Sequence, residues 1–230
     1  MDKRAAGMGE KPAAVIFDMD GVIFDTENLR LNIMRSLAPK YGLGDVEPVY
    51  TSVTGMTEAA TEQRYYERYG PTLPYAAIRA EARELEERHV KRIGPPVKPG
   101  VAELMDFLEG EGVLVGLASS GDMQNIRFLM ERAGLISRFC AIVSGDSVKR
   151  GKPAPDIYLA AAGALNIDPA RAWAVEDAYH GVEAAHAAGM RVAMVPDRLP
   201  PTKHTRALCA LTVSSLIELK KAFAALWREG

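Results

Sequence analysis

The chain has 230 residues, 48% of them hydrophobic and 25% charged, which is typical of a globular protein with one large domain or one domain carrying a smaller insert. The net charge is −2 and the pI about 6.1, with basic and acidic residues interspersed, which excludes the basic surface of a nucleic-acid binder. No apolar run approaches the ~18 residues that span a bilayer, and the first residues lack the apolar core of a signal peptide. We therefore expect a cytoplasmic protein without a nucleic-acid or membrane partner.

The first apolar run, AAVIF at 13–17, predicts a buried strand, and two carboxylates, Asp18 and Asp20, follow it directly. Asp is a poor strand former, and a buried carboxylate is costly unless a partner compensates its charge. Packing alone therefore does not explain the pair, and we expect a functional role. Asp25, by contrast, is equally well explained as the cap of a turn or helix.

The segment 26–93 contains no convincing strand. Three stretches in it have the spacing of amphipathic helices, namely 27–42, 57–70 and 74–93, and the Gly- and Pro-rich sequence GPPVKPG follows. A connection of this length without a fold of its own would be unusual in a compact domain. We therefore predict a helical insert at 26–93 and a core formed by 1–25 and 94–230.

After residue 100, short apolar runs alternate with helical segments. The runs, at 113–119, 139–145, 172–177 and 191–196, are rich in Val, Ala and Ile and predict strands buried on both faces. Helical spacing lies between them, for example at 123–134 and 155–166. This alternation predicts an α/β fold with a parallel sheet covered by helices.

The two cysteines are too few for a disulfide framework or a cysteine metal cluster. Cys140 lies in the apolar sequence FCAIV, so we expect a small core residue within a strand, and we expect a structural role for Cys209 as well.

Chemically active side chains follow four of the predicted strands. In an open α/β sheet, ligands bind outside the carboxyl ends of the strands, so these side chains should gather in one crevice. They are Asp18 and Asp20, Ser119 and Ser120, Lys152, and Glu176 and Asp177.

The chemistry of this set is that of phosphoryl transfer. Carboxylates such as Asp18, Glu176 and Asp177 are ligands that suit Mg²⁺. Two unit charges about 4 Å apart interact by roughly 4 kcal/mol at an effective dielectric constant of about 20, so such a cluster needs a cation. Lys152 and Mg²⁺ would supply positive charge, and the hydroxyl and amide groups of Ser119 and Ser120 would donate to a phosphate.

Four motifs, DMDGVIFDTE, LASSGD, GKPAPDIY and VEDAYHG, occur in the order found in the haloacid dehalogenase superfamily, which the chain resembles over nearly its whole length. The resemblance implies a Rossmann-like core, a mobile helical cap at 26–93, and Mg²⁺ as cofactor. It also implies these roles: Asp18 as nucleophile, Asp20 as general acid and base, Ser119 and Lys152 as phosphate ligands, and Asp18, the Asp20 carbonyl and Asp177 as metal ligands, with Glu176 as a further carboxylate at the metal.

We expect a Mg²⁺-dependent phosphatase, most simply a monomer, that hydrolyses a small phosphorylated metabolite such as a sugar or nucleoside monophosphate. Asp20 favours phosphate esters over the dehalogenase and phosphonatase chemistry of the superfamily. The alternative is a β-phosphoglucomutase-like isomerase, and a non-catalytic binding protein is a third possibility. Arg30 and Glu58 stand where β-phosphoglucomutases carry a His and an Arg, which favours the phosphatase, and Ala178 stands where many relatives have Ser.

Overall fold

The computed structural model describes residues 10–53, 56 and 58–228. The chain divides into two compact units, a core unit that runs up to Phe24 and resumes at Val97, and a helical unit, Asp25–Pro96. The predicted boundaries, residues 26 and 93, lie beside these limits. The role of the helical unit as a cap stays a prediction, and each unit is described by itself.

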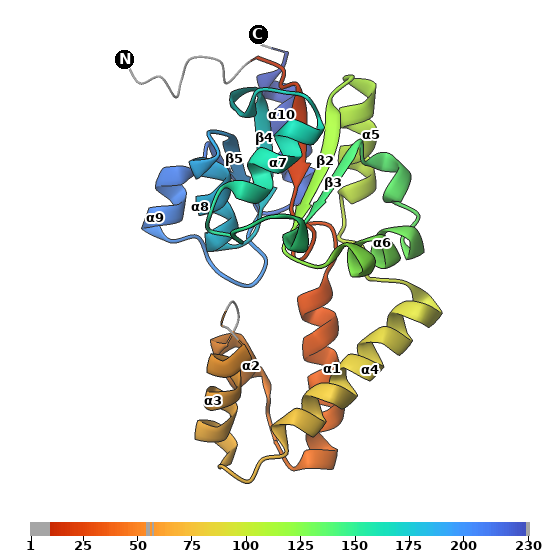
Figure 1. Cartoon of the computed structure of the whole chain (residues 1–230), viewed down its shortest axis with the longest axis vertical. Coiled ribbons are helices and arrows are strands. Elements are labelled where there is room, and N and C mark those ends of the chain that lie inside the picture. The colour runs from red at the N-terminus through yellow and green to blue at the C-terminus, as the bar shows by residue number, and fades with distance from the viewer. Residues whose placement is uncertain (1–9, 54–55, 57, 229–230) are drawn as a thin grey trace. The chain divides into compact units, whose positions relative to one another are not determined.

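The described part of the core unit contains one sheet of six strands in the order β3-β2-β1-β4-β5-β6, and all neighbouring strands are parallel (Figure 1). The strands are β1 (Ala14–Phe17), β2 (Leu114–Ser119), β3 (Ala141–Ser144), β4 (Ala172–Glu176), β5 (Arg191–Met194) and β6 (Leu211–Thr212). The helices are α5 (Val101–Gly110), α6 (Met123–Arg132), α7 (Asp156–Ala164), α8 (Tyr179–Ala187), α9 (Lys203–Leu208) and α10 (Leu216–Leu226), with short 3-10 helices at Ile136–Arg138, Gly145–Ser147 and Pro169–Arg171. The predicted parallel sheet covered by helices is confirmed.

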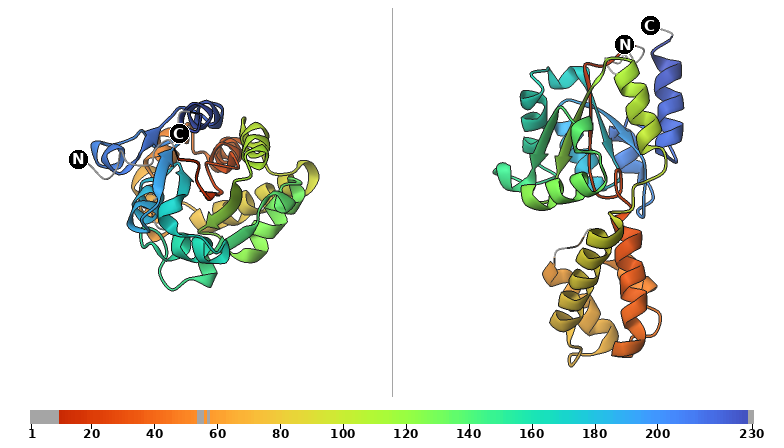
Figure 2. Two further views of the ribbon diagram at one scale, coloured as in Figure 1. Left: turned by 90° about the horizontal axis from the view of Figure 1, so that it is seen from above. Right: turned by 90° about the vertical axis from the view of Figure 1, so that its right-hand side faces the viewer.

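Helices cover both faces of this sheet (Figure 2). On one face, α7 and α8 contribute small buried residues such as Ala161 and Ala184, which allow the helices to approach the strands closely. On the other face, α5 lies beside α10, and Phe223 of α10 packs edge-on against Trp173 of β4 with ring centroids 5.1 Å apart. The strands are therefore apolar on both sides, as the near-continuous apolar runs of the sequence predict.

The helical unit consists of α1 (Thr26–Tyr41), α2 (Glu47–Ser52), α3 (Glu58–Tyr69) and α4 (Tyr75–Ile93). Asp25 precedes α1 and accepts a hydrogen bond from the side chain of Asn28, while Gly42 ends the helix with a φ of 66°. Tyr65 and Tyr75 are buried with ring centroids 5.3 Å apart and hold α3 against α4. No helix among the described residues is long and apolar enough to cross a bilayer.

Some local predictions were wrong or incomplete. Cys140 was predicted to be a core residue within a strand, but it is exposed. The strand β3 begins one residue later, at Ala141, and the two residues before it lie outside the core. Cys209 is half-buried against the core beside α8, in line with a structural role. The elements α2, α5, α9, α10 and β6 were not predicted individually.

Candidate active site

The carboxyl ends of β1 and β4 form the centre of the candidate site. The strands β2 and β3 lie on one side of β1. The strands β4, β5 and β6 lie on its other side, so the strand order reverses between β1 and β4. Asp18 directly follows β1, and Glu176 is the last residue of β4. The backbone N–H of Asp18 donates to the carbonyl of Val175 at 3.0 Å and holds the strand ends together. Such a reversal point is where ligands bind in open α/β sheets.

Lys152 lies between the two buried acids. Its Nζ is 2.5 Å from Asp18 Oδ1, 2.6 Å from Glu176 Oε1 and 3.2 Å from the carbonyl oxygen of Ala118. An ammonium group has three N–H donors, so these three acceptors use all of them. The structure thus joins residues from the ends of β1, β2 and β4 through one cation.

Two glycines make room for the acid side chains. Gly21 has a φ of +81°, and a Cβ at this position would lie 2.2 Å from Asp177 Oδ2. A Cβ at Gly181, in α8, would lie 1.9 Å from Glu176 Oε1. Both distances are far below van der Waals contact, so the carboxylates of Glu176 and Asp177 occupy space that a side chain at either glycine would fill.

When all three are ionised, the carboxylates of Asp18, Glu176 and Asp177 carry more negative charge than Lys152 balances. Burial raises the pKa of Asp18 from its usual 3.8 to about 7, even though Lys152 acts to lower it. Burial, together with the charges of Glu176 and Asp18, also raises the pKa of Asp177 well above its usual value. Burial lowers the pKa of Lys152, but Asp18 and Glu176 outweigh this effect and hold the pKa above its usual value. The lysine is therefore a cation at neutral pH.

The same acids fit a divalent cation. One carboxylate oxygen each from Asp18, Glu176 and Asp177 lies within 4.8 Å of the others, and the excess of negative charge calls for a cation beyond Lys152. Oxygen ligands of this kind are those that Mg²⁺ takes. The side chain of Asp20 is not part of this set, and the expected contribution of its carbonyl stays a prediction.

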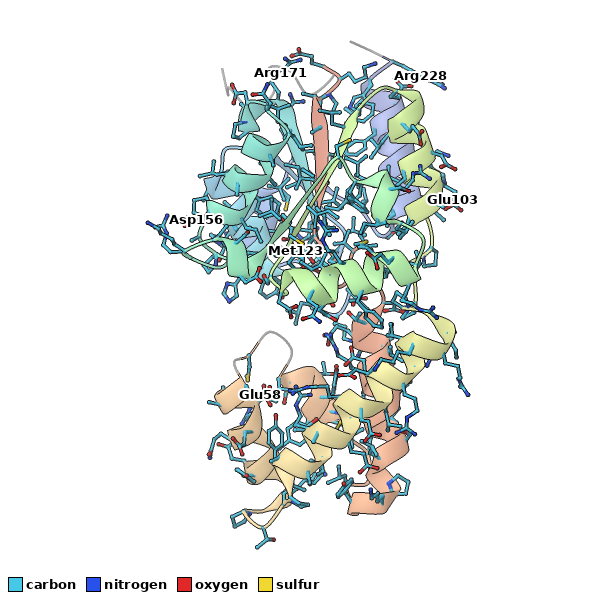
Figure 3. The ribbon with its side chains drawn as sticks, turned by 45° about the vertical axis from the view of Figure 1, so that its right-hand side comes forward. Glu58, Glu103, Met123, Asp156, Arg171 and Arg228 are labelled. Carbon is cyan, nitrogen blue, oxygen red and sulfur yellow. The ribbon has the colours of Figure 1, made fainter. Side chains whose placement is uncertain are left out.

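The two serines predicted to bind phosphate lie in different environments. Ser119, the last residue of β2, is fully buried, and its Oγ accepts a hydrogen bond from the N–H of Gly121 at 3.2 Å. Ser120 is exposed. The first turn of α6, which begins at Met123 (Figure 3), is capped by Asp122, whose carboxylate accepts the N–H of Asn125 at 2.8 Å. The carboxylate of Asp122 therefore takes one of the helix N–H groups that an anion would need.

Comparison with known proteins identifies the family. A family model described as haloacid dehalogenase-like hydrolase matches residues 15–195. The chain belongs to this family. It is 34% identical to a phosphorylated carbohydrates phosphatase of Thermotoga maritima, over 77% of this chain and 82% of the relative. It is 32% identical to a β-phosphoglucomutase of Bacillus subtilis, over 77% of this chain and 80% of that relative.

A solved haloacid dehalogenase family hydrolase from Deinococcus radiodurans, with bound phosphate and sodium, superimposes with a TM-score of 0.80 at 26% identity, covering 93% of this chain and 96% of that one. These comparisons confirm the predicted family, fold class and enzyme class, a phosphatase.

One residue of this haloacid dehalogenase-like site was not predicted. Tyr158, in α7, is fully buried, and its hydroxyl donates to Glu176 Oε1 at 2.5 Å. Lys152 Nζ lies 5.1 Å from the centroid of the Tyr158 ring. The motif GKPAPDIY contains this tyrosine, but a tyrosine on an apolar helix face is usually a core residue, so only the three-dimensional contact reveals it.

The helical unit has a cavity of about 320 Å³ of its own. Among the described residues that line it are three glutamates and three arginines, namely Glu27, Glu58, Glu86, Arg30, Arg79 and Arg83. Arg30 pairs with Glu27 at 3.2 Å and with Glu86 at 2.9 Å, and Glu58, at the start of α3 (Figure 3), pairs with Arg79 at 3.1 Å. The charged groups around the cavity therefore balance one another.

Proposed function

We propose that the chain is a Mg²⁺-dependent phosphatase that hydrolyses a small phosphorylated metabolite, a sugar or nucleoside monophosphate, through an aspartyl-phosphate on Asp18. The observation that carries this proposal is the buried ammonium group of Lys152, which bridges Asp18 and Glu176 at the reversal point of the sheet. The relative named a phosphorylated carbohydrates phosphatase supports a sugar phosphate as the first substrate to test.

The contacts of Asp18 assign its two oxygens different tasks. Oδ1 accepts from Lys152, so Oδ2 is the oxygen that attacks phosphorus. The new bond joins Oδ2 to phosphorus while the ester bond to the leaving oxygen breaks. Asp20, two residues further on, donates its proton to that leaving oxygen. Water then attacks phosphorus and gives its proton to Asp20 while the bond between Oδ2 and phosphorus breaks, which releases inorganic phosphate and regenerates Asp18.

Positive charge stabilises this reaction. Asp18, Glu176 and Asp177 would hold Mg²⁺, together with the carbonyl of Asp20, and the ion would supply positive charge opposite the phosphoryl oxygens. Lys152 holds Asp18 in a fixed orientation and compensates part of the charge of the acids. Because the pKa of Asp18 is raised to about 7, this extra positive charge also favours the ionised carboxylate that attack requires.

The charge balance of the helical unit favours a phosphatase over a mutase. A mutase has to retain a sugar bisphosphate by its remote phosphate while the near phosphate reacts, which requires a cationic anchor. Arg30 is engaged by two glutamates, and Glu58 presents a carboxylate to the cavity. The equal numbers of glutamates and arginines that line this cavity give it no net positive charge to attract a second phosphate.

The deciding experiment measures two products in one reaction. The enzyme is incubated with Mg²⁺, β-glucose 1-phosphate and a catalytic amount of glucose 1,6-bisphosphate, and glucose 6-phosphate and free phosphate are quantified. We expect free phosphate, also from other sugar monophosphates, and no bisphosphate-dependent glucose 6-phosphate. Rapid glucose 6-phosphate formation with little free phosphate would assign the mutase instead.

Two variants test the roles of the aspartates. Asp18→Asn keeps the side-chain shape but forms no aspartyl-phosphate, so turnover should disappear. Asp20→Asn should lose turnover of alkyl phosphates but retain a burst of phosphorylation by an aryl phosphate, whose leaving group needs no proton. If Asp20→Asn slowed phosphorylation by alkyl and aryl phosphates equally, the general-acid role of Asp20 would be contradicted.

A further inference from the structure

Tyr158 contacts both ionic partners at the base of the site. Its ring is fully buried in the core between α7 and the sheet, and its hydroxyl makes a 2.5 Å hydrogen bond to Glu176 Oε1. An ionised carboxylate oxygen can only accept, so the hydroxyl is the donor in this bond. A buried hydroxyl is costly without a partner, and here the partner is an acid of the candidate metal cluster.

Two donors converge on the same oxygen of Glu176. Oε1 accepts from Tyr158 at 2.5 Å and from Lys152 at 2.6 Å, whereas Oε2 accepts a long bond of 3.3 Å from the N–H of Asp177. On the other side, the backbone of Gly181 lies against the carboxylate. Rotation of the carboxylate would break two short hydrogen bonds, so Oε2 is the oxygen held toward Asp177.

The hydroxyl also affects how Lys152 is shared. Glu176 and Asp18 both accept from the same ammonium group. Tyr158 satisfies part of the hydrogen-bonding capacity of Glu176 Oε1, so Glu176 needs less from Lys152, and the lysine remains in contact with Asp18. Without the hydroxyl, Glu176 would be free to turn and to draw Lys152 away from Asp18.

We propose that Tyr158 is a positioning residue that fixes Glu176 through its Oε1 atom, and so directs Oε2 to the cation and keeps Lys152 on the nucleophile. This inference rests on the proposed Mg²⁺-dependent function. Groups that orient metal ligands typically change metal affinity or activity by about 10–100-fold when they are removed. A positioning role therefore predicts an effect on Mg²⁺ binding, which a purely structural tyrosine would not have.

The test compares Tyr158→Phe with a matched control, Tyr179→Phe. The control removes a hydroxyl of the same unit that donates to a backbone group, the carbonyl of Pro200 at 2.7 Å, and not to one of the acids. Mg²⁺ binding is measured by titration calorimetry without substrate. We expect affinity to fall by about 10-fold or more in Tyr158→Phe and to change by less than about 2-fold in the control. Melting temperatures of the Mg²⁺-free variants verify folding.

A double variant shows whether Tyr158 acts through Glu176. In a Glu176→Gln background, Tyr158→Phe should change Mg²⁺ affinity far less than in the wild-type chain, because the two substitutions act on one group. Additive losses would overturn the positioning role, and so would a wild-type affinity in Tyr158→Phe. If the wild-type chain binds Mg²⁺ but hydrolyses no phosphate ester, the proposed function fails while the binding comparison still tests Tyr158.

The kinetics give a second readout. At saturating Mg²⁺, Tyr158→Phe should lower kcat while the KM for the phosphate ester changes little, because the hydroxyl acts on the acids rather than on the substrate. A change confined to KM would overturn this assignment.

Discussion

Asp18→Asn should abolish turnover, but it should also make the Mg²⁺-free protein more stable at alkaline pH. The pKa of Asp18 is raised to about 7 in the folded chain, whereas the unfolded side chain ionises at its usual 3.8. The unfolded chain therefore loses this proton first, and stability falls as the pH rises from about 4 to about 7. Once both states are ionised, the buried charge destabilises the fold by about 4 kcal/mol at most.

Asparagine removes this cost because it is neutral and has nearly the same shape, and Lys152 keeps Glu176 as its counter-ion. For a chain of this size, ~1 kcal/mol corresponds to about 2–4 °C, so the melting temperature should rise by several degrees, up to about 16 °C for the full value. Asp18 and Asp177 repel one another, so protonation of either acid removes the same repulsion. The value of about 4 kcal/mol assigned to Asp18 alone is therefore an upper limit.

The assay is thermal unfolding followed by circular dichroism, in chelator, at about pH 8 and about pH 5. At pH 5 less than half of the cost remains, because the folded carboxyl is then protonated. Saturating Mg²⁺ should reduce or reverse the difference, because the wild-type site then gains binding energy. Asp20→Asn is the control for loss of a nearby carboxylate. A variant less stable than the wild type at pH 8 in chelator, or a difference independent of pH, would refute the reasoning.

Two further substitutions test the packing of the acids. Lys152→Ala leaves Asp18 and Glu176 without their shared cation. Urea unfolding should therefore show a free energy of unfolding lower by ~3–5 kcal/mol, and the rate of phosphate release should fall as well. A variant as stable and active as the wild type would show that Lys152 has no role in the site. Gly181→Ala places a methyl group against the Glu176 carboxylate and should weaken Mg²⁺ binding measured by calorimetry. The control is Gly163→Ala, whose added carbon has nothing within 4 Å and should leave Mg²⁺ binding unchanged. Equal Mg²⁺ affinities of the two variants would contradict the close packing at Gly181.

The sequence predicted the strands that carry a dense apolar run. β1 and β4 are buried along their whole length, so their composition alone distinguishes them from surface segments. β6 has only two residues, Leu211 and Thr212, and pairs at the edge of the sheet, too short to give any periodic pattern. Cys140 was misplaced because an apolar run does not show which of its side chains are buried: its N–H donates to the carbonyl of Val115 in β2 at 2.8 Å, but its side chain is exposed.

The candidate site was predictable where backbone topology alone brings residues together. Parallel strands end at one edge, so Asp18 and Glu176 had to be neighbours once β1 and β4 were adjacent. Tyr158 could not be predicted, because its hydroxyl reaches Glu176 only through the packing of α7 against the sheet. Likewise, the hydrogen bond between the Ser119 hydroxyl and Gly121 is a matter of side-chain rotation, which composition and spacing do not encode.

The junction between the two units has a consequence for how such chains diversify. On the core side, Phe24 and Val97 pair as a single antiparallel bridge, and on the other side the N–H of Asp25 donates to the carbonyl of Pro96 at 2.8 Å. In each unit, the two residues at which the chain passes to the other unit are therefore paired with each other. An inserted segment whose ends already lie together adds little loop-closure entropy to its host, whatever its length. Recombination at this point can replace the whole of Asp25–Pro96 without altering the strand pairing of the core, so selection can act on the helices and on the acid cluster as separable modules.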